Sequence, residues 1–216
     1  MKYKTILFDL DGTLLDTLSD ITYSVNQAFI SNGFNINLSY EESKKGIGLD
    51  VNYMLKLAID SNDLKVSQEL YQNIYNDFIK IYTLHRNTFT KPFDQVVETL
   101  KELKKTGHSI GVCSNKLDIA TKDCVSNYFG NIFDFVVGST PGKPMKPDKE
   151  YFDVFSEKYH IDKESTLYVG DMIYDIIFAN NVGMDVAIYK KGYGKKEDQC
   201  KATYVLESFS DLIKIV

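Results

Sequence analysis

Six short apolar runs constrain the fold of this chain more than any other feature of its sequence. They cover residues 5–8, 109–113, 133–137, 166–169, 185–189 and 202–206. Runs of this length without a polar alternation are typical of strands that are buried on both faces. Helical patterns lie between them, such as the stripe of Val96, Leu100 and Leu103 that Gly107 ends. Strands therefore alternate with helices from about residue 92 onward, which predicts a doubly wound, mostly parallel sheet.

Residues 15–89 break this alternation and carry helical patterns throughout. Four stripes of apolar residues recur at helical spacing, and Ser39 with Glu42 forms a capping box before the second. We therefore expect an α/β protein with a Rossmann-like core in residues 1–14 and 90–216. An all-helical domain in residues 15–89 is expected to be inserted directly after the first strand.

The bulk composition limits the partners of the chain. Its 216 residues carry a formal net charge of −5, so we expect no nucleic-acid partner, because phosphate backbones recruit basic surfaces. The spacing of Cys113, Cys124 and Cys200 does not fit a zinc site, and three reduced thiols are expected. No apolar stretch reaches the length of a signal peptide or a membrane span. The sequence predicts a cytoplasmic protein without a membrane partner, and nothing in it indicates an oligomeric state.

The first apolar run ends in two acidic residues, Asp9 and Asp11. In open α/β sheets, the reactive groups gather beyond the carboxyl ends of the strands, near a topological switch point. Two close carboxylates repel each other, so one of them must bind a metal or hold a proton. This favours a division of labour in which Asp9, held on Mg²⁺, attacks phosphorus while Asp11 carries the proton for the leaving oxygen. Gly12 would let the backbone approach the phosphoryl group.

Further polar residues follow later strands or precede a helix. Ser114 and Asn115 follow the second run and offer a hydroxyl and backbone N–H groups to a phosphoryl oxygen. Lys146 precedes a helix and supplies a compact positive charge. Asp171 follows the fourth run and can complete an oxygen shell for Mg²⁺. Asp175, one helical turn later, can bind a metal-bound water or orient Lys146.

These segments resemble the four motifs of the haloacid-dehalogenase-like phosphatases. The matching residues are Asp9-Leu10-Asp11-Gly12-Thr13, Ser114-Asn115, Lys146-Pro147-Asp148, and Gly170-Asp171 with Asp175. They occur in the order of the family and span essentially the whole chain, and the helical insert is similar to the small mobile cap of that family. Within the family, residues 16–20, 46–49 and 192–194 most resemble phosphoglycolate-phosphatase-type members.

The resemblance implies a role for each of these residues. Asp9 would form an aspartyl-phosphate, and Asp11 would act as the general acid and then as the base for water. Mg²⁺ would be bound by Asp9, the backbone carbonyl of Asp11, and Asp171, with Asp175 in support. The phosphoryl group would be held by Gly12, Thr13, Ser114, Asn115 and Lys146. A small phosphate monoester is the implied substrate, with 2-phosphoglycolate as the leading candidate. The presence of Asp11 argues against carbon–halogen hydrolysis, because the dehalogenating members lack an aspartate there.

Several alternatives stay open at this point. A phosphomutase of the β-phosphoglucomutase type shares all four motifs, and inorganic pyrophosphate or a nucleoside monophosphate are further candidate substrates. A non-catalytic regulator on the same fold would tolerate the loss of Asp9 or Asp11, yet both are present. A purely structural interaction module has no positive feature in the sequence.

One departure from the family motifs and two choices between lysines complete these expectations. Met172 stands where this subgroup often has a serine or threonine after the metal-binding aspartate. Lys143 is a rival to Lys146, which we prefer for its spacing to Asp171. Lys44 or Lys45, just before the loop of residues 46–49, could meet a substrate carboxylate when the cap closes, whereas a solvated surface is the alternative.

Overall fold

The computed structural model describes residues 2–216, and the chain divides into two compact units. The first unit combines the residues up to Asp16 with Pro92–Val216, and the second is Thr17–Lys91. These limits lie two residues after those expected from the sequence, 14 and 89. A two-stranded sheet of β2, Leu15–Asp16, and β3, Lys91–Pro92, pairs the outgoing chain with the returning chain.

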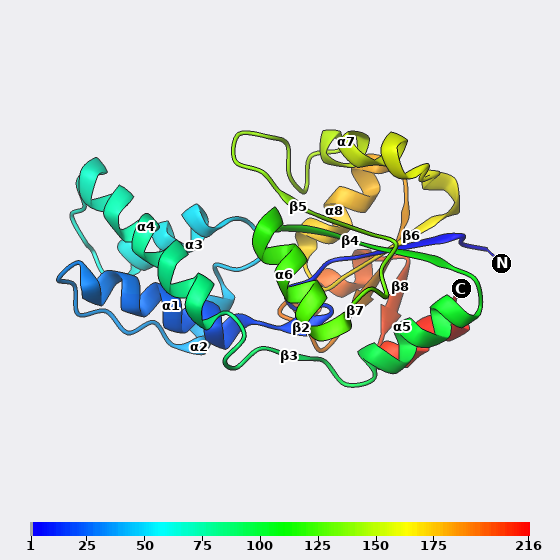
Figure 1. Cartoon of the computed structure of the whole chain (residues 1–216), viewed down its shortest axis with the longest axis horizontal. Coiled ribbons are helices and arrows are strands. Elements are labelled where there is room, and N and C mark those ends of the chain that lie inside the picture. Colours follow the sequence, from blue (N-terminus) through cyan, green and yellow to red (C-terminus); the bar gives the residue numbers. More distant parts are fainter. Residues whose placement is uncertain (1) are drawn as a thin grey trace. The chain divides into compact units, whose positions relative to one another are not determined.

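The first unit is built on a six-stranded sheet with the order β5-β4-β1-β6-β7-β8 (Figure 1). Neighbouring strands all run parallel, as expected for strands joined by helical crossovers. The strands are β1 Thr5–Phe8, β4 Ser109–Leu117, β5 Phe135–Ser139, β6 Thr166–Gly170, β7 Asp185–Tyr189 and β8 Tyr204–Leu206. The prediction of an α/β, Rossmann-like fold from the apolar runs is confirmed.

Two apolar clusters cover the two faces of this sheet. Because successive side chains of a strand point to opposite faces, Ile6 and Phe8 belong to one cluster and Leu7 to the other. Figure 1 shows α7 and α8 on one side of the sheet and α5 with the C-terminal segment on the other. The covering elements are α5 Val96–Lys105, α6 Asp118–Phe129 and the 3₁₀ segment η3 Phe209–Lys214 on one face, and α7 Glu150–Tyr159 and α8 Ile173–Val182 on the other.

Strand β4 differs from the expectation at its carboxyl end. The sequence predicted that it stops at Cys113, but it continues to Leu117, with a register shift against β5 between these two residues. The extension is stabilised by pairing of Leu117 with Ser139 of β5. Ser114 and Asn115 therefore lie in the strand and not at the start of α6.

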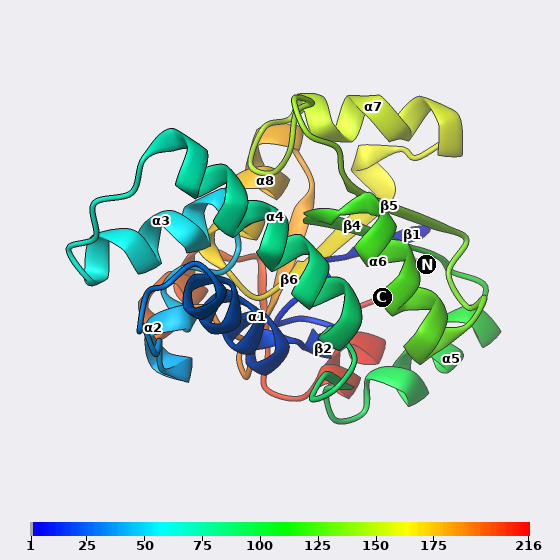
Figure 2. The ribbon, with the colours of Figure 1, turned by 60° about the vertical axis from the view of Figure 1, so that its left-hand side comes forward.

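The second unit is all-helical, as the four apolar stripes predicted. Ser39 accepts a hydrogen bond from the Glu42 N–H and Glu42 from the Ser39 N–H, so the predicted capping box is present. Helices α1 and α4 pack side by side (Figure 2). The helices are α1 Leu18–Ser31, α2 Tyr40–Lys44, α3 Val51–Ser61 and α4 Gln68–His85. No helix within residues 2–216 has the length and apolar character needed to cross a membrane.

Candidate active site

The candidate site lies at the topological switch point of the sheet. The chain leaves β1 toward β4 on one side and leaves β6 toward β7 on the other, so β1 and β6 are the neighbours whose connections diverge. Asp9 directly follows β1 and Asp171 directly follows β6. The Asp9 N–H donates to Val169 O at 2.9 Å, which fixes the end of β1 against β6. The carboxyl ends of two central strands thus bring two predicted site residues together.

Three buried carboxylates gather at this point. Asp9, Asp171 and Asp175 each contribute an oxygen, and these oxygens lie within 4.8 Å of one another. Burial raises the pKa of Asp9 from 3.8 to about 6, although the Lys146 ammonium opposes this shift. Burial and the Asp175 and Asp9 carboxylates raise the pKa of Asp171 well above its usual range. A cation bound here would favour the charged forms of Asp9 and Asp171 over the protonated forms.

The chemistry of the donor set fits a hard divalent cation. Within the described residues 2–216, Asp9 Oδ1 is buried and accepts no hydrogen bond. Lys146 Nζ lies 3.0 Å from this oxygen, but not at a hydrogen-bonding angle. Carboxylate oxygens are the preferred ligands of Mg²⁺. Asp9 and Asp171 would hold such an ion, as the sequence predicted, and the cluster adds Asp175, whereas the Asp11 carboxylate is not part of it.

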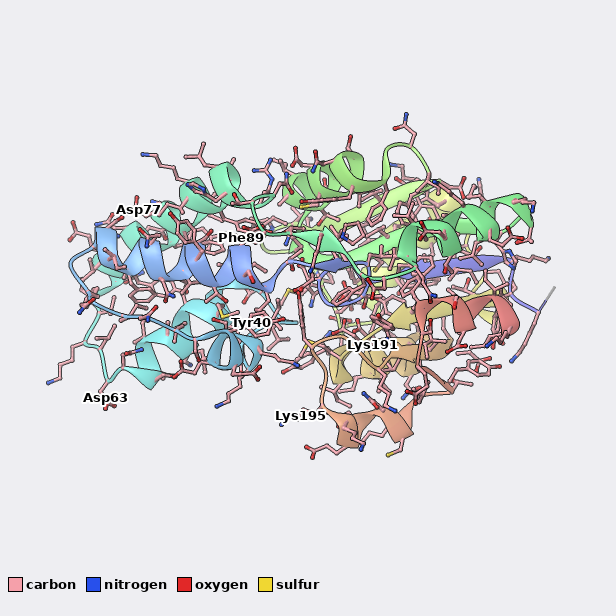
Figure 3. All side chains as sticks on the ribbon, turned by 90° about the horizontal axis from the view of Figure 1, so that it is seen from below. Tyr40, Asp63, Asp77, Phe89, Lys191 and Lys195 are labelled. Atoms are coloured by element: carbon pink, nitrogen blue, oxygen red, sulfur yellow. The ribbon has the colours of Figure 1, made fainter. Side chains whose placement is uncertain are left out.

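The Asp171 carboxylate is held from two sides. Thr13 Oγ1 donates to its Oδ1 and the Tyr193 N–H donates to its Oδ2, both at 2.7 Å. Gly12 has a φ of 89°, and a Cβ at this position would overlap the Asp171 carboxylate and the Tyr193 ring. A glycine is therefore required here by close packing as well as by its positive φ. Lys191 and Lys195, labelled in Figure 3, flank the loop that carries Tyr193.

Lys146 is a fully buried ammonium that faces this cluster. Its Nζ donates to Asp175 Oδ1 at 2.7 Å and to the hydroxyl of Tyr168 at 2.8 Å. Burial alone would lower the pKa of Lys146, but the Asp175 and Asp9 carboxylates outweigh it and raise this pKa. Asn115 fixes the backbone of Lys146, since its Nδ2 donates to Lys146 O at 2.9 Å and its Oδ1 accepts from Lys146 N at 2.8 Å.

Asp175 has two functions in the fold of this site. Besides accepting from Lys146, it accepts hydrogen bonds through Oδ2 from the N–H groups of Asp171 at 3.1 Å and Met172 at 3.0 Å. These donors belong to the start of α8, where backbone N–H groups lack helical partners. Asp175 therefore caps the helix without the hydroxyl that Met172 replaces, and it orients Lys146 at the same time.

Asp11 contacts a residue that the sequence analysis did not select. Lys116 Nζ donates to both carboxylate oxygens of Asp11, at 2.8 and 3.0 Å. The side chain of Lys116 is 5% exposed and that of Asp11 is 14% exposed, so water screens this ion pair only weakly. The nearby Ser114 is buried, and its Oγ accepts a long hydrogen bond of 3.3 Å from the Lys116 N–H.

The predicted site residues are divided between the two units, and most of them belong to the first. Asp9, Asp11, Ser114, Lys146, Asp171 and Asp175 all lie in the first unit, and Lys146 is buried whereas its rival Lys143 is exposed. The side chains of Thr13 and Asn115, predicted to hold phosphate, contact Asp171 and the Lys146 backbone. Lys44 and Lys45 lie at the end of α2 in the second unit.

Three residues around the site were missed by reasoning from the sequence. Lys116, Tyr168 and Tyr193 contact Asp11, Lys146 and Asp171. The signal for Lys116 was its place directly after Asn115, and the signal for Tyr193 was its place between two glycines. Tyr168 had no such signal, because a tyrosine within an apolar run is typical of a core residue.

Comparison with known proteins identifies relatives over the full length of the chain. A phosphoglycolate phosphatase of Aquifex aeolicus is 30% identical over 216 residues, which cover 99% of this chain and 96% of the relative. Pyrophosphatase PpaX of Halalkalibacterium halodurans is 28% identical over 221 residues, which cover 100% of this chain and 98% of the relative.

A solved structure supports the fold. The crystal structure of a predicted phosphoglycolate phosphatase from Haemophilus somnus superposes with a TM-score of 0.92 at 24% identity, and the match covers 100% of this chain and 98% of the other. A family model described as haloacid dehalogenase-like hydrolase matches residues 6–189. The chain therefore belongs to the haloacid dehalogenase-like hydrolase family, which confirms the resemblance predicted from its four motifs.

Proposed function

We propose that this hydrolase is a Mg²⁺-dependent phosphatase that hydrolyses a small phosphate monoester through a phosphorylated Asp9. The proposal is supported above all by Asp9 Oδ1, a buried carboxylate oxygen that accepts no hydrogen bond from residues 2–216. The Lys146 ammonium lies 3.0 Å from it. An unengaged carboxylate oxygen beside a fixed cation is suited to nucleophilic attack on phosphorus, because the cation stabilises charge on the transferring group.

In the first half of the reaction, Asp9 Oδ1 attacks phosphorus and the bond to the leaving oxygen breaks. Asp11 in its protonated form, which the water of the preceding turnover regenerates, gives its proton to that oxygen, so the product leaves as an alcohol. Lys146 and Ser114 hold the phosphoryl oxygens in line with Asp9. Mg²⁺, held by Asp9, Asp171 and the backbone carbonyl of Asp11, would supply charge neutralisation to the phosphoryl group.

In the second half, water hydrolyses the aspartyl-phosphate. Asp11, now deprotonated, takes a proton from the water as the water attacks phosphorus. The bond between Asp9 and phosphorus breaks, which restores the Asp9 carboxylate and releases inorganic phosphate. Both carboxylate oxygens of Asp11 accept hydrogen bonds from Lys116, at 2.8 and 3.0 Å. This ion pair must therefore open before Asp11 can contact the leaving-group oxygen or the attacking water.

We propose 2-phosphoglycolate as the leading substrate, because phosphoglycolate phosphatases occur among the full-length relatives. We also propose that the enzyme acts in the cytoplasm. Inorganic pyrophosphate is the second candidate, since a relative of similar identity and coverage is a pyrophosphatase. The helical unit would serve as a mobile cap, and Lys44 or Lys45 would contact the substrate carboxylate. A β-phosphoglucomutase-type transfer and a nucleotidase activity are the remaining alternatives.

The test is phosphate release by the purified chain and by an Asp9→Asn variant. We expect Mg²⁺-dependent release from 2-phosphoglycolate, and loss of turnover by about 10³-fold or more in the variant, because an amide cannot act as the nucleophile. The same panel should contain pyrophosphate, a nucleoside monophosphate and a hexose phosphate. Chelation of Mg²⁺ should abolish release, and its return should restore it.

Asp153→Asn is a matched control, because Asp153 is an exposed aspartate on α7 outside the site. It should keep full activity. Retained turnover in a folded Asp9→Asn variant would refute the nucleophile assignment. Preferential release from pyrophosphate would transfer the proposal to the second candidate, and isomer conversion without phosphate release would favour the phosphomutase.

A further inference from the structure

Tyr168 is a buried tyrosine of β6 that lies beneath the candidate site, three residues before Asp171. Its side chain is fully buried, and its ring packs edge-on against Phe178 of α8 with 5.3 Å between the ring centroids. The register pairs it with Leu7 of β1, in the middle of the sheet. A hydroxyl at this depth cannot exchange its partners for bulk water, so each of its hydrogen bonds is fixed by the fold.

The Tyr168 hydroxyl donates one hydrogen bond and accepts another. It lies 2.9 Å from the backbone carbonyl of Cys113, which can only accept, so the single O–H donates there. Lys146 Nζ then donates to the hydroxyl oxygen at 2.8 Å. Asp175 Oδ1 is a more distant acceptor, at 3.4 Å. Tyr168 therefore bridges the Lys146 ammonium to β4, directly before Ser114.

The Lys146 ammonium has three N–H groups and three close neighbours, Asp175, Tyr168 and Asp9. Asp175 at 2.7 Å and Tyr168 at 2.8 Å take two of them at good geometry. The third neighbour is Asp9 Oδ1, at 3.0 Å but outside hydrogen-bonding angles. Two fixed bonds leave one N–H of the ammonium, and the 3.0 Å distance to Asp9 Oδ1 keeps the ammonium beside the carboxylate at which a phosphoryl group would be transferred.

We propose that Tyr168 is a positioning residue that holds the Lys146 ammonium in place for the transferring phosphoryl group, an inference that rests on the proposed function. Asp175 alone cannot fulfil this role. Without the hydroxyl, the close partners left to Nζ among residues 2–216 would be the carboxylates of Asp175 and Asp9. The ammonium would then be drawn onto the nucleophile and lose its orientation toward the phosphoryl group, which lowers stabilisation of the transition state more than binding of the substrate.

Tyr168→Phe tests this proposal, because it removes the hydroxyl and keeps the ring. We expect kcat for the best substrate of the panel to fall about tenfold, the size expected for a lost hydrogen bond to a charged group, while KM changes less than about twofold. Tyr3→Phe is the matched control. Tyr3 is also a buried tyrosine at the core sheet, but its hydroxyl donates to Asp185 at 2.5 Å, near the start of β7 and away from the site.

The control separates positioning from a general loss of stability. Both variants should lower the thermal midpoint, and only Tyr168→Phe should lower kcat. An unchanged kcat in Tyr168→Phe, or an equal fall in Tyr3→Phe, would overturn the proposal. Loss of activity in Lys146→Met with full activity in Tyr168→Phe would contradict this inference alone, whereas full activity in both Lys146→Met and Asp9→Asn would contradict the proposed function.

A second measurement detects the ammonium directly and does not depend on whether Tyr168→Phe folds. In protein labelled with ¹⁵N in its lysines, a fixed and buried ammonium keeps a resolved ¹⁵N–¹H signal at neutral pH, whereas exposed lysines lose theirs by exchange with water. We expect one such signal to disappear in Lys146→Met. Absence of a protected ammonium signal at this lysine would overturn the proposal.

Discussion

At the scale of single residues, the candidate site is a place where charge is buried before the substrate arrives. Asp9, Asp171 and Asp175 are buried together, and Lys146 forms ion pairs with Asp9 and Asp175. Burying like charges costs free energy, and sites of catalysis are where such costs are concentrated. We therefore expect the site to oppose folding when Mg²⁺ is absent.

The Asp9→Asn variant gives a prediction with a defined sign. Burial raises the pKa of Asp9 from 3.8 to about 6, so its folded form binds the proton more tightly than the unfolded chain does. The resulting destabilisation is fully present above pH 6 and disappears as the pH falls below about 4. In chelator at pH 7.5, Asp9→Asn should raise the free energy of unfolding by about 2–3 kcal/mol, measured by denaturant titration.

The dependence on pH and on Mg²⁺ checks this account. The advantage of the variant should shrink as the pH is lowered from 7 to 4. Saturating Mg²⁺ should stabilise the unsubstituted protein and have a smaller effect on the variant, because one predicted ligand is lost. A variant that is less stable than the parent at pH 7.5 in chelator would contradict a net free-energy cost of burying the Asp9 charge.

At the scale of elements, the pairing of β4 with β5 depends on a glycine in β4. Gly111 pairs with Phe135, and a Cβ at Gly111 would overlap the Phe135 ring. That ring stacks on Tyr159 of α7 with 4.6 Å between the centroids, so it cannot simply turn away. The glycine allows an aromatic side chain to lie across the neighbouring strand and close the apolar cluster beneath α7.

Gly111→Ala should therefore lower the free energy of unfolding by about 1–3 kcal/mol, the usual cost of overpacking a core. Denaturant titration would measure it. Phe135→Leu should remove part of the overlap, so the double variant should lose less stability than the sum of the two single variants. Strict additivity would show that the overlap with Phe135 is not the cause.

At the scale of the whole molecule, one buried carboxylate links the first and last segments of the helical unit. Asp20, in the first turn of α1, is completely buried and accepts hydrogen bonds from the Phe89 and Thr90 N–H groups and from Thr90 Oγ1. The bond lengths to Thr90 are 2.9 Å for N and 2.7 Å for Oγ1. Asp20 thus ties the chain that enters this unit to the chain that leaves it.

Asp20→Ala should destabilise the helical unit by about 2–3 kcal/mol, because buried backbone donors lose their acceptor. Hydrogen exchange is the measurement: amides of α1 and α4 should exchange faster, while those of β1 and β6 keep their protection. Asp60→Ala, at an exposed position of α3, should have little effect. An equal loss of protection in β1 and β6 would show that the two units do not open separately.

Much of the fold was predictable because its signals are local. Apolar runs such as residues 5–8 and the four helical stripes report which segments are buried, and a parallel sheet follows from their alternation. Asp9 and Asp171 were predictable as well, because reactive groups follow strands at one edge of such a sheet, and Lys146 was predictable from its place in a family motif before a helix. The extension of β4 beyond Cys113 was not predictable, since it depends on the partner strand β5.

The class of fold, the family and the residues at the ends of the strands follow from local patterns in the chain. The groups that those residues contact depend on how the strands are assembled: Lys116 contacts Asp11, Tyr193 contacts Asp171, and Tyr168 contacts Lys146. These contacts join residues 22 to 105 positions apart, and they exist because the order of the strands brings their ends together. Apolar periodicity records burial, but the choice of partner depends on strand order and register, which no local pattern contains.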